Sequence, residues 1–449
     1  MALRFCCPFM FGPIITLLLL SFALAWSVFL SAGISPSDWD VTLLVLGCAS
    51  SGYWLFTRPL HRAPPLKGWL RCLIYLFPAY LIFQLIPLKA GILQILSPAR
   101  ARLLRDLAPV VPALKSAPLS VIPPSAVLSL FTMLAYIATF LLVRELAWRF
   151  SVRPWTPVVP LIALALFEAG LGMFQVFTGW PSASATGTYT NRDHFAGLLE
   201  MILPFVSLFG LVILRNKKKR FAASSALMAC AMWAIASVVL LAIIYSLSRM
   251  GFLATLCALC IVGALTMRGR LHSRAWRWWS FSAISLAVVL MFVFFPPNQL
   301  IERFAGISST QKISADTRLA LWRETLPLIS EYRFFGCGLG GFESVFLKYQ
   351  EAASNFRVEF AHNDYLQYFV ELGMLGFSIL ASIVAGLFIQ TFREAARSRD
   401  ESRRLLLIAC AAGFSAMLLH SLVDFNMYIP ANAMALVWIA GLGAGTSIP

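Results

Sequence analysis

Uncharged, strongly apolar runs of about 20 residues recur along the whole chain, and this recurrence most constrains what it can fold into. An α-helix needs about 20 apolar residues to cross the hydrocarbon core of a bilayer. Twelve runs of this kind are present, at residues 10–33, 41–57, 72–88, 125–143, 157–177, 195–214, 221–247, 250–267, 278–295, 365–390, 405–423 and 427–446. The sequence therefore predicts an all-α integral membrane protein with about twelve transmembrane helices.

The composition excludes soluble alternatives. Of the 449 residues, 59% are hydrophobic and 12% are charged, whereas soluble globular proteins are about 45–50% apolar and about 25% charged. A disordered basic tail would be poor in apolar residues. The formal net charge of +16 raises the question of nucleic acid binding, and the answer depends on where the charge lies.

The basic residues lie in alternate connections between the predicted spans. With the N-terminus in the cytoplasm, the cytoplasmic connections hold 22 basic and 4 acidic residues, and the rest of the chain holds 14 basic and 16 acidic residues. This asymmetry follows the positive-inside rule. We therefore expect a multi-pass membrane protein, with both termini cytoplasmic and no nucleic acid partner. We also expect the first run to remain as a span, although residues 23–25 resemble a signal-peptide cleavage site.

Three predicted external connections are long enough to hold a site: 91–124, 178–194 and 296–364. The third is the longest and separates spans nine and ten. Apolar residues at helical spacing predict an amphipathic helix within it: Leu319, Trp322, Leu326 and Ile329. The glycine-rich run 336–341 lacks the lysine of a phosphate-binding loop and predicts a tight turn. The cytoplasmic connections, about 6–15 residues long, leave no room for a nucleotide-binding domain, so we expect no direct use of ATP.

Basic side chains stand at the outer ends of the predicted spans and in the external connections, against the charge bias: Arg192, His194, Arg249, Arg318 and His362. Each has a purely structural alternative. Arg249 lies in a tight turn, where its guanidinium could reach lipid headgroups. For Arg318 the alternative is an ion pair on a helix surface, and for His362 it is an ordinary interfacial hydrogen bond.

Ionisable residues also occur within or at the ends of the apolar runs, where they are costly and invite functional interpretations. Three are glutamates that could instead pair locally: Glu168, Glu200 and Glu371. His420 and Asp424 are four residues apart, on one helix face, at the end of the eleventh span. For these two the pattern favours a structural hydrogen bond.

Taken together, the external residues indicate chemistry on a diphosphate. A guanidinium matches phosphate oxygens with two parallel hydrogen bonds. A histidine has an unperturbed pKa of about 6.5 and can accept the proton of an attacking hydroxyl. Because arginines can hold an anionic leaving group and no cluster of carboxylates is present, we expect neither a metal ion nor another cofactor.

The segments that carry these residues resemble the O-antigen ligase/polymerase superfamily of bacterial polytopic glycosyltransferases. Five segments occur in the family's order and extend over residues 186–432: TGTYTNRDHFAGLLE, SLSRMGFLA, TRLALWRETLPLISEYRFFGCGLGGF, AHNDYLQYFVELGMLGF and HSLVDFNMYIPAN. The resemblance predicts two parts: transmembrane helices of spans one to five at 1–178, and an O-antigen ligase-like domain of spans six to twelve at 179–449.

The resemblance implies transfer of a glycan from a polyprenyl-diphosphate carrier, such as undecaprenyl diphosphate, to a hydroxyl acceptor on the periplasmic face. Carried over by position, the implied catalytic residues are Arg249, Arg318 and His362. The implied substrate-binding residues are Arg192, His194 and Asn363. Asp193 departs from the family pattern, which often has asparagine there, and this puts the donor preference in question.

Several activities stay open at this level. Within the family they are ligation to lipid A–core in lipopolysaccharide synthesis, polymerisation of O-antigen or exopolysaccharide repeat units, and transfer to protein, with a slight preference for polymerisation from the ending HSLVDFNMYIPAN. From other classes the alternatives are a twelve-span transporter or lipid-linked glycan flippase, and a membrane scaffold. A transporter would be expected to show repeats and a midplane site, whereas the polar residues here gather at one face.

Overall fold

The computed structural model describes residues 11–57, 62–110, 115–180, 184–215, 223–268, 315–351 and 357–448, and these residues are mostly α-helical. In chain order the elements are α1 (Phe11–Phe29), η2 (Ser31–Gly33), α2 (Pro36–Phe56), α3 (Gly68–Leu85), β1 (Leu88–Lys89), α4 (Ala90–Leu96), α5 (Pro98–Leu107), β2 (Ser116–Ala117), α6 (Pro123–Arg149), η4 (Thr156–Val158), α7 (Val159–Thr178), α8 (Arg192–Arg215), α9 (Ala223–Tyr245), α10 (Arg249–Arg268), α13 (Ala315–Glu331), α14 (Phe342–Phe346), α15 (Asp364–Arg397), α16 (Glu401–His420), η5 (Asn426–Tyr428) and α17 (Pro430–Thr446). The predicted all-α class is confirmed.

Within these ranges, nine helices are long and apolar enough to cross a membrane: α1, α3, α6, α7 with η4, α8, α9, α10, α15 and α16. Helices α2 and α17 occupy two further predicted spans without reaching that standard, and α17 has only 17 residues. The predicted span at 278–295 lies outside the described residues. These helices identify the chain as a membrane protein. The count of twelve spans stays a prediction.

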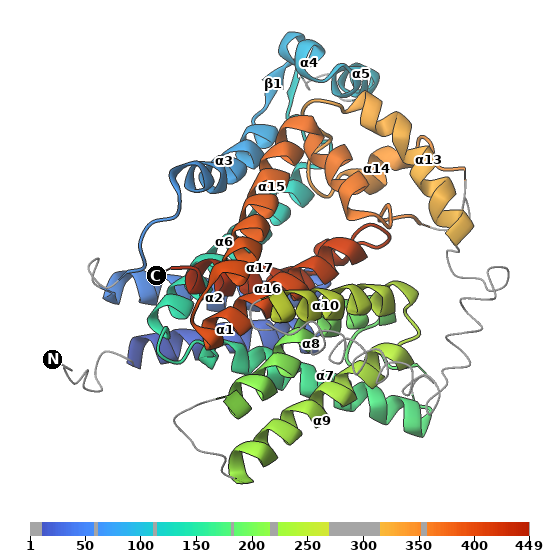
Figure 1. Ribbon diagram of the computed structural model, residues 1–449. Helices are drawn as coiled ribbons and strands as arrows, with labels where there is room; N and C mark the ends of the chain where they lie inside the picture. The colour runs from blue at the N-terminus through green and yellow to red at the C-terminus, as the bar shows by residue number, and fades with distance from the viewer. Residues whose placement is uncertain are drawn as a thin grey trace.

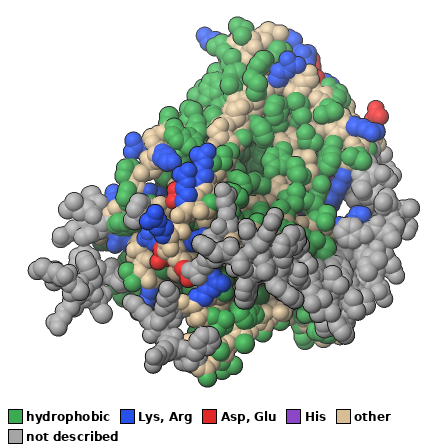
Figure 2. Space-filling model, in the orientation of Figure 1, with side chains coloured by type: hydrophobic (Ala, Val, Ile, Leu, Met, Phe, Trp, Pro, Cys, Tyr) green, Lys and Arg blue, Asp and Glu red, His purple; other side chains and the backbone are tan. Residues whose placement is uncertain are grey.

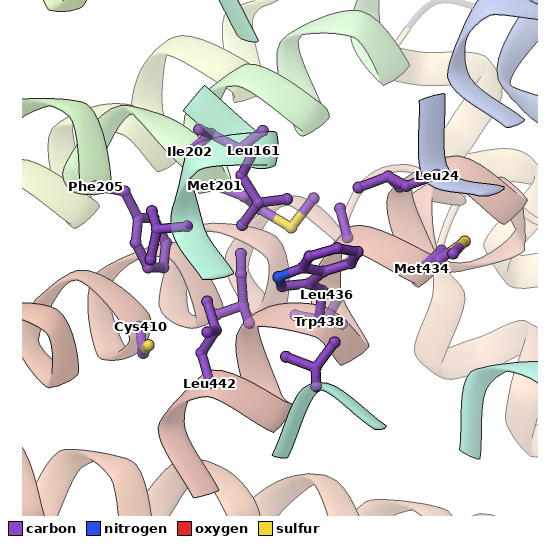
Figure 3. Close-up of a cluster of buried hydrophobic side chains, with 14 of the residues drawn as sticks. Leu24, Leu161, Met201, Ile202, Phe205, Cys410, Met434, Leu436, Trp438 and Leu442 are labelled. Carbon is purple, nitrogen blue, oxygen red and sulfur yellow. The ribbon is translucent and has the colours of Figure 1, made fainter. Parts of the chain in front are cut away.

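The centre of the molecule is the packing of α8, α16 and α17 against α6 and α7 (Figure 1). Trp438 of α17 is fully buried there, and its indole Nε1 donates to the carbonyl oxygen of Pro157 at 3.0 Å. Figure 3 shows Trp438 among apolar side chains from α1, α7, α8 and α16. A Cβ atom on Gly413 would lie 2.4 Å from the Met201 carbonyl oxygen, so α8 and α16 approach as closely as glycine permits.

The described chain starts and ends on one side of the molecule, at the left of Figure 1, while α13 and α14 lie toward the opposite side. Hydrophobic side chains cover much of the face shown in Figure 2, with Lys and Arg side chains gathered toward its left and its upper edge. A broad apolar surface bordered by cationic groups is the pattern expected of a protein embedded in a bilayer.

The glycine-rich run 336–341 forms the tight turn that its sequence predicts. Gly336, Gly338 and Gly340 have φ values of +71°, +89° and +74°, a region that glycine enters at little cost. The turn pairs with α15 at a break in that helix, where Gly373 has φ +64°. The Gly338 N–H donates to the Glu371 carbonyl oxygen at 2.9 Å, and the Met374 N–H donates to that of Arg333 at 2.7 Å.

Two side chains of helix α3 hold together the glycine-rich turn and the break in α15. The Tyr80 hydroxyl donates to the carbonyl oxygens of Phe335 and Leu372, at 2.9 and 2.5 Å. The Gln84 amide donates to those of Phe335 and Glu371, at 2.6 and 3.1 Å. The external connection that follows α13 is therefore tied to α15 through main-chain groups.

Gly336→Ala is expected to lower the free energy of unfolding by about 3 kcal/mol or more. An added Cβ would lie 2.1 Å from the Glu371 carbonyl oxygen, and left-handed backbone at a non-glycine residue alone costs about 1–3 kcal/mol. Gly170→Ala in α7 is the control, because no atom lies within 4 Å of its new Cβ and alanine favours a helix. Thermal unfolding in detergent measures both; equal midpoints for the two variants would contradict the close approach.

The predicted amphipathic helix is confirmed as α13, but only part of its predicted apolar face packs inward: Ile329 contacts the apolar cluster, and the Trp322 indole donates to the Ala361 carbonyl oxygen at 3.0 Å. Leu319 and Leu326 are 48% and 56% exposed, whereas Leu321 and Leu328 are fully buried. The buried stripe is instead Leu321, Thr325, Leu328 and Tyr332. This stripe faces the cluster formed by α14 and the chain around Val358, because the pairing of residues 333–338 with α15 fixes the rotation of α13.

The predicted connection 91–124 folds into helices α4 and α5 closed by a two-residue ribbon. Strands β1 and β2 are antiparallel, with Leu88 opposite Ala117 and Lys89 opposite Ser116. Helix α5 reaches the end of α13, where Arg102 lies 3.2 Å from Glu331. This connection therefore covers the same external region as α13.

Candidate active site

Three arginines occupy the first turns of three helices whose N-terminal ends meet at one place. Arg192 and Arg249 are the first residues of α8 and α10, and Arg318 is the fourth residue of α13. Their charges are close enough for Arg249 and Arg318 both to repel Arg192. A helix N-terminus carries about half a positive charge, which disfavours a cation there. Such an arrangement is suited to an anion bound from outside.

The turn that carries Arg249 is built by its serines. The Ser248 hydroxyl accepts from the Gly251 N–H at 3.1 Å and caps α10, and Leu247 before it has φ +59°. A Cβ on Gly251 would lie 2.6 Å from the Cβ of Ala196. The first turn of α10 is therefore pressed against the first turns of α8, which places Arg249 close to Arg192.

The segment before α8 is held by α7. The Glu168 carboxylate accepts from the backbone N–H and the hydroxyl of Thr188, at 2.9 and 2.8 Å. The Gln175 side chain accepts from the N–H groups of Thr186 and Gly187, at 3.0 and 2.8 Å. Glu168 thus pairs locally, which was the structural alternative for this residue. The contact with Thr188 also fixes the segment that leads to Arg192.

His362 stands in the segment before α15 and faces Asp424, which lies in the turn after α16. The distance from His362 Nδ1 to Asp424 Oδ1 is 3.4 Å. His362 has φ +50°, a strained conformation for a residue other than glycine. With Nδ1 directed at the carboxylate, Nε2 is the ring nitrogen left to accept a proton, which is the arrangement of a histidine–aspartate pair in acid–base catalysis.

Two further histidines face the same carboxylate. His194 Nε2 lies 3.8 Å from Asp424 Oδ1, and His420 Nε2 lies 3.9 Å from Asp424 Oδ2. The ring of Phe425 packs edge-on against the rings of His194 and His362, at centroid distances of 4.6 and 4.9 Å. Asp424 is thus the point at which α8, α16 and the segment before α15 meet.

The environment of Asp424 keeps this carboxyl ionised. Burial alone would raise its pKa, but the adjacent His194 and His362 and the charge of Arg318 hold the pKa of Asp424 well below its usual value of 3.8. Arg318 also joins the two halves of the site, because its Nη1 donates to the Val423 carbonyl oxygen at 2.7 Å. The arginines and the His362–Asp424 pair therefore form one site.

Asp424→Asn is expected to lower the free energy of unfolding by about 3 kcal/mol at neutral pH, because it removes the buried carboxylate that faces Arg318 and two histidines. Since the folded pKa lies below the ordinary 3.8, this stabilisation is complete above that pH and is lost as pH falls through the folded value. Thermal unfolding of both proteins measures it. The difference in midpoint should be constant from about pH 8 to pH 5 and shrink only below about pH 3.8; a difference that already shrinks near pH 6 would contradict the lowered pKa.

Two predicted substrate-binding positions have structural partners. The Asn363 side-chain oxygen accepts from the Leu366 N–H at 3.1 Å and caps α15. Asp193, the departure from the family pattern, lies 4.0 Å from Arg318 Nη2. Its carboxylate therefore stands among the arginines, where a bound anion would compete with it.

An apolar cavity opens beside this site. Its lining includes Asp364 and Tyr365 at the start of α15, close to His362 in the chain, and Met427 of η5. It continues between the apolar faces of α3, α6, α15 and α16, past Ile74, Met133, Leu380 and Leu418. The site thus has a polar part beside the first turn of α13 and an apolar part between the spans.

Part of the chain is similar to a known protein family. Residues 234–381 match the sequence profile of the family described as O-antigen ligase. Over this stretch the chain is similar to the O-antigen ligase family. No curated protein matches the chain.

The matched stretch contains four of the predicted site residues, Arg249, Arg318, His362 and Asn363. Arg192, His194 and Asp424 lie outside it, so the fold brings residues from within and beyond the matched stretch close together. The predicted tight turn, the amphipathic helix and the three arginines lie at the same end of the helices.

Sequence reasoning treated His420 and Asp424 as a structural pair, and their contact with each other is the weaker one, at 3.9 Å. What it missed is that Asp424 faces His362. The sequence did contain a sign of this contact, because three histidines and this aspartate all lie near the ends of predicted spans. Within the described ranges, no group of three or more His, Cys, Asp or Glu side chains is arranged to hold a metal ion.

Proposed function

We propose that this O-antigen ligase family protein transfers a glycan from a polyprenyl-diphosphate carrier to a hydroxyl acceptor on the periplasmic face of the bacterial inner membrane. One observation supports the proposal most. Arg318 belongs to the group of three arginines at helix N-termini, and it also contacts the turn that holds the His362–Asp424 pair. The arginines suit a diphosphate and the pair suits a hydroxyl group.

In the proposed reaction, the acceptor oxygen attacks the anomeric carbon of the donor sugar. A new C–O glycosidic bond forms, and the bond between the anomeric carbon and the diphosphate oxygen breaks. The acceptor proton passes to Nε2 of His362, while Asp424 holds the opposite ring nitrogen and stabilises the imidazolium. The diphosphate leaves with the electron pair of the broken bond, and Arg249 and Arg318 balance its charge.

The remaining site residues support the substrates. Arg192 adds to the positive charge that receives the diphosphate, and His194 and Asn363 lie where sugars of the donor or acceptor would pass. The apolar cavity past Asp364 is suited to a lipid tail, because its walls are aliphatic and aromatic side chains of four spans. A polyprenyl carrier would place its diphosphate at the arginines and its tail in this cavity.

The proposed orientation places both termini in the cytoplasm and the site in the periplasm, as the distribution of charge favours. Residues 1–178 would serve as membrane scaffold, and 179–449 as the transferase part. The reaction as drawn needs no metal, since arginines carry the leaving-group charge.

The direct test uses purified protein in detergent with a polyprenyl-diphosphate-linked glycan and a hydroxyl acceptor. We expect one new glycosidic bond for each polyprenyl diphosphate released, and we expect the rate to be unchanged by EDTA. A twelve-span transporter or flippase would make no such bond. Absence of product with any of a lipid A–core, oligosaccharide or protein acceptor would refute the proposed transfer.

The acceptor class is decided in cells. In a deletion strain, loss of all polymer from lipopolysaccharide indicates a ligase, and a band with a single repeat unit indicates a polymerase. An unchanged ladder indicates transfer to an exopolysaccharide or to protein. Of these we favour a polymerase, from the segment HSLVDFNMYIPAN that holds Asp424.

A further inference from the structure

A second pair of ionisable side chains contacts Asp424 from the membrane interior. Glu200 in α8 and His420 at the end of α16 are both fully buried. His420 Nδ1 lies 3.0 and 3.1 Å from the two carboxylate oxygens of Glu200, and its Nε2 lies 3.9 Å from Asp424 Oδ2. The contacts therefore run from Glu200 through His420 and Asp424 to His362.

Helix packing alone does not explain this pair. Ionisable side chains within spans are costly, and replacing a buried ion pair with apolar residues is often neutral or stabilising. Helices α8 and α16 already meet at Gly413, where the Met201 backbone leaves no room for a side chain. The contact between Glu200 and His420 is therefore not needed to bring the two helices together.

The two oxygens of Asp424 have different neighbours. Oδ1 accepts from the Phe425 N–H at 2.9 Å and faces His362 and His194. Oδ2 faces only His420 among the ion-pair partners that the described residues provide. Rotation of the Asp424 carboxylate would turn Oδ1 away from His362, and the group placed to resist that rotation is His420.

We propose that Glu200 and His420 form a positioning pair that fixes the Asp424 carboxylate for His362. Both ring nitrogens of His420 face carboxylates, and a neutral imidazole has only one N–H to donate. The contact with Glu200 fixes the orientation of the His420 ring, and the fixed ring then faces Asp424 Oδ2. Neither residue touches substrate; they act through Asp424. The inference rests on the proposed transferase function.

Glu200→Gln is the first test, because it keeps the side-chain size and removes the charge. We expect kcat for glycan transfer to fall about tenfold, as for other residues that orient a catalytic group, with both substrate KM values within about twofold of wild type. His420→Gln should give the same loss. Because the two residues act as one unit, the double variant should lose no more than either single variant.

Glu145→Gln is the matched control. Glu145 is also buried, in α6, and accepts from the Tyr53 hydroxyl and the Ala63 N–H at 3.2 and 2.9 Å. It lies near the opposite end of the spans from Arg318, so its variant should keep wild-type kcat. Thermal midpoints of all variants separate lost folding from lost turnover.

The variant Glu200→Leu/His420→Leu keeps the inference testable if the glutamine variants do not fold, because it leaves no buried charge unpaired. Its kcat should also fall about tenfold in folded protein. Wild-type kcat in this variant, or in both glutamine variants, would overturn the positioning role. If wild-type protein makes product while these variants are unaffected, only the positioning role fails; if wild-type protein makes none, the proposed function fails.

Discussion

His362→Ala is expected to lower kcat for glycan transfer by about 10²–10⁴-fold, the range typical of a lost general base. Substrate KM values should change little, because His362 is assigned to the proton of the attacking hydroxyl and not to either lipid. The measurement is product formation by purified protein with a lipid-linked donor.

The backbone at His362 calls for a second variant. Its φ of +50° is strained for alanine, whereas asparagine enters this region more readily. His362→Asn should therefore fold at least as well as His362→Ala and lose the same activity. If His362→Asn retained wild-type kcat, the ring would not be the base, and the residue would serve only the turn.

Arg318→Ala is expected to lower kcat/KM for the donor by about 10²–10³-fold, the usual loss when one group that stabilises transition-state charge is removed. Arg318 is also the residue that links the arginines to the turn holding Asp424, so both kcat and donor KM should change. Arg318→Lys keeps the charge but not the planar fork, and an intermediate loss is expected.

Arg323→Ala is the control for this prediction. Arg323 lies on the same helix, five residues further along, with an exposed side chain. Its variant should keep donor kcat/KM within about twofold, the effect of a surface substitution. Equal losses in Arg318→Ala and Arg323→Ala would indicate that α13 contributes general positive charge and no specific contact.

The sequence predicts the all-α class and most of the apolar helices well, because both follow from local patterns. Apolar length decides where a span lies, and basic residues decide which ends share a side. The three arginines could be singled out for the same reason. Each lies at a predicted external position, whereas most basic residues lie in the predicted cytoplasmic connections. The tight turn at 336–341 followed from its glycines.

Contacts between distant segments could not be predicted in this way. Asp424 is 62 residues from His362 and 230 from His194, and no periodicity connects such positions. The break at Gly373 was hidden because the segment around it keeps the apolar character of a span. The buried face of α13 depends on that break. The rotation of α13 about its own axis therefore could not be predicted from the sequence either.

The pairing of the glycine-rich turn with the break in α15 has a consequence for how substrates reach the site. The segment that bears His362 leads directly into α15, and the turn after α13 is fastened to that helix by main-chain hydrogen bonds. His362 therefore stands at a fixed position relative to α15 and cannot travel toward a distant acceptor. Under the proposed function an acceptor hydroxyl would have to be delivered to that position, so the length of the glycan between a lipid anchor and its reactive end would itself be a criterion for selection.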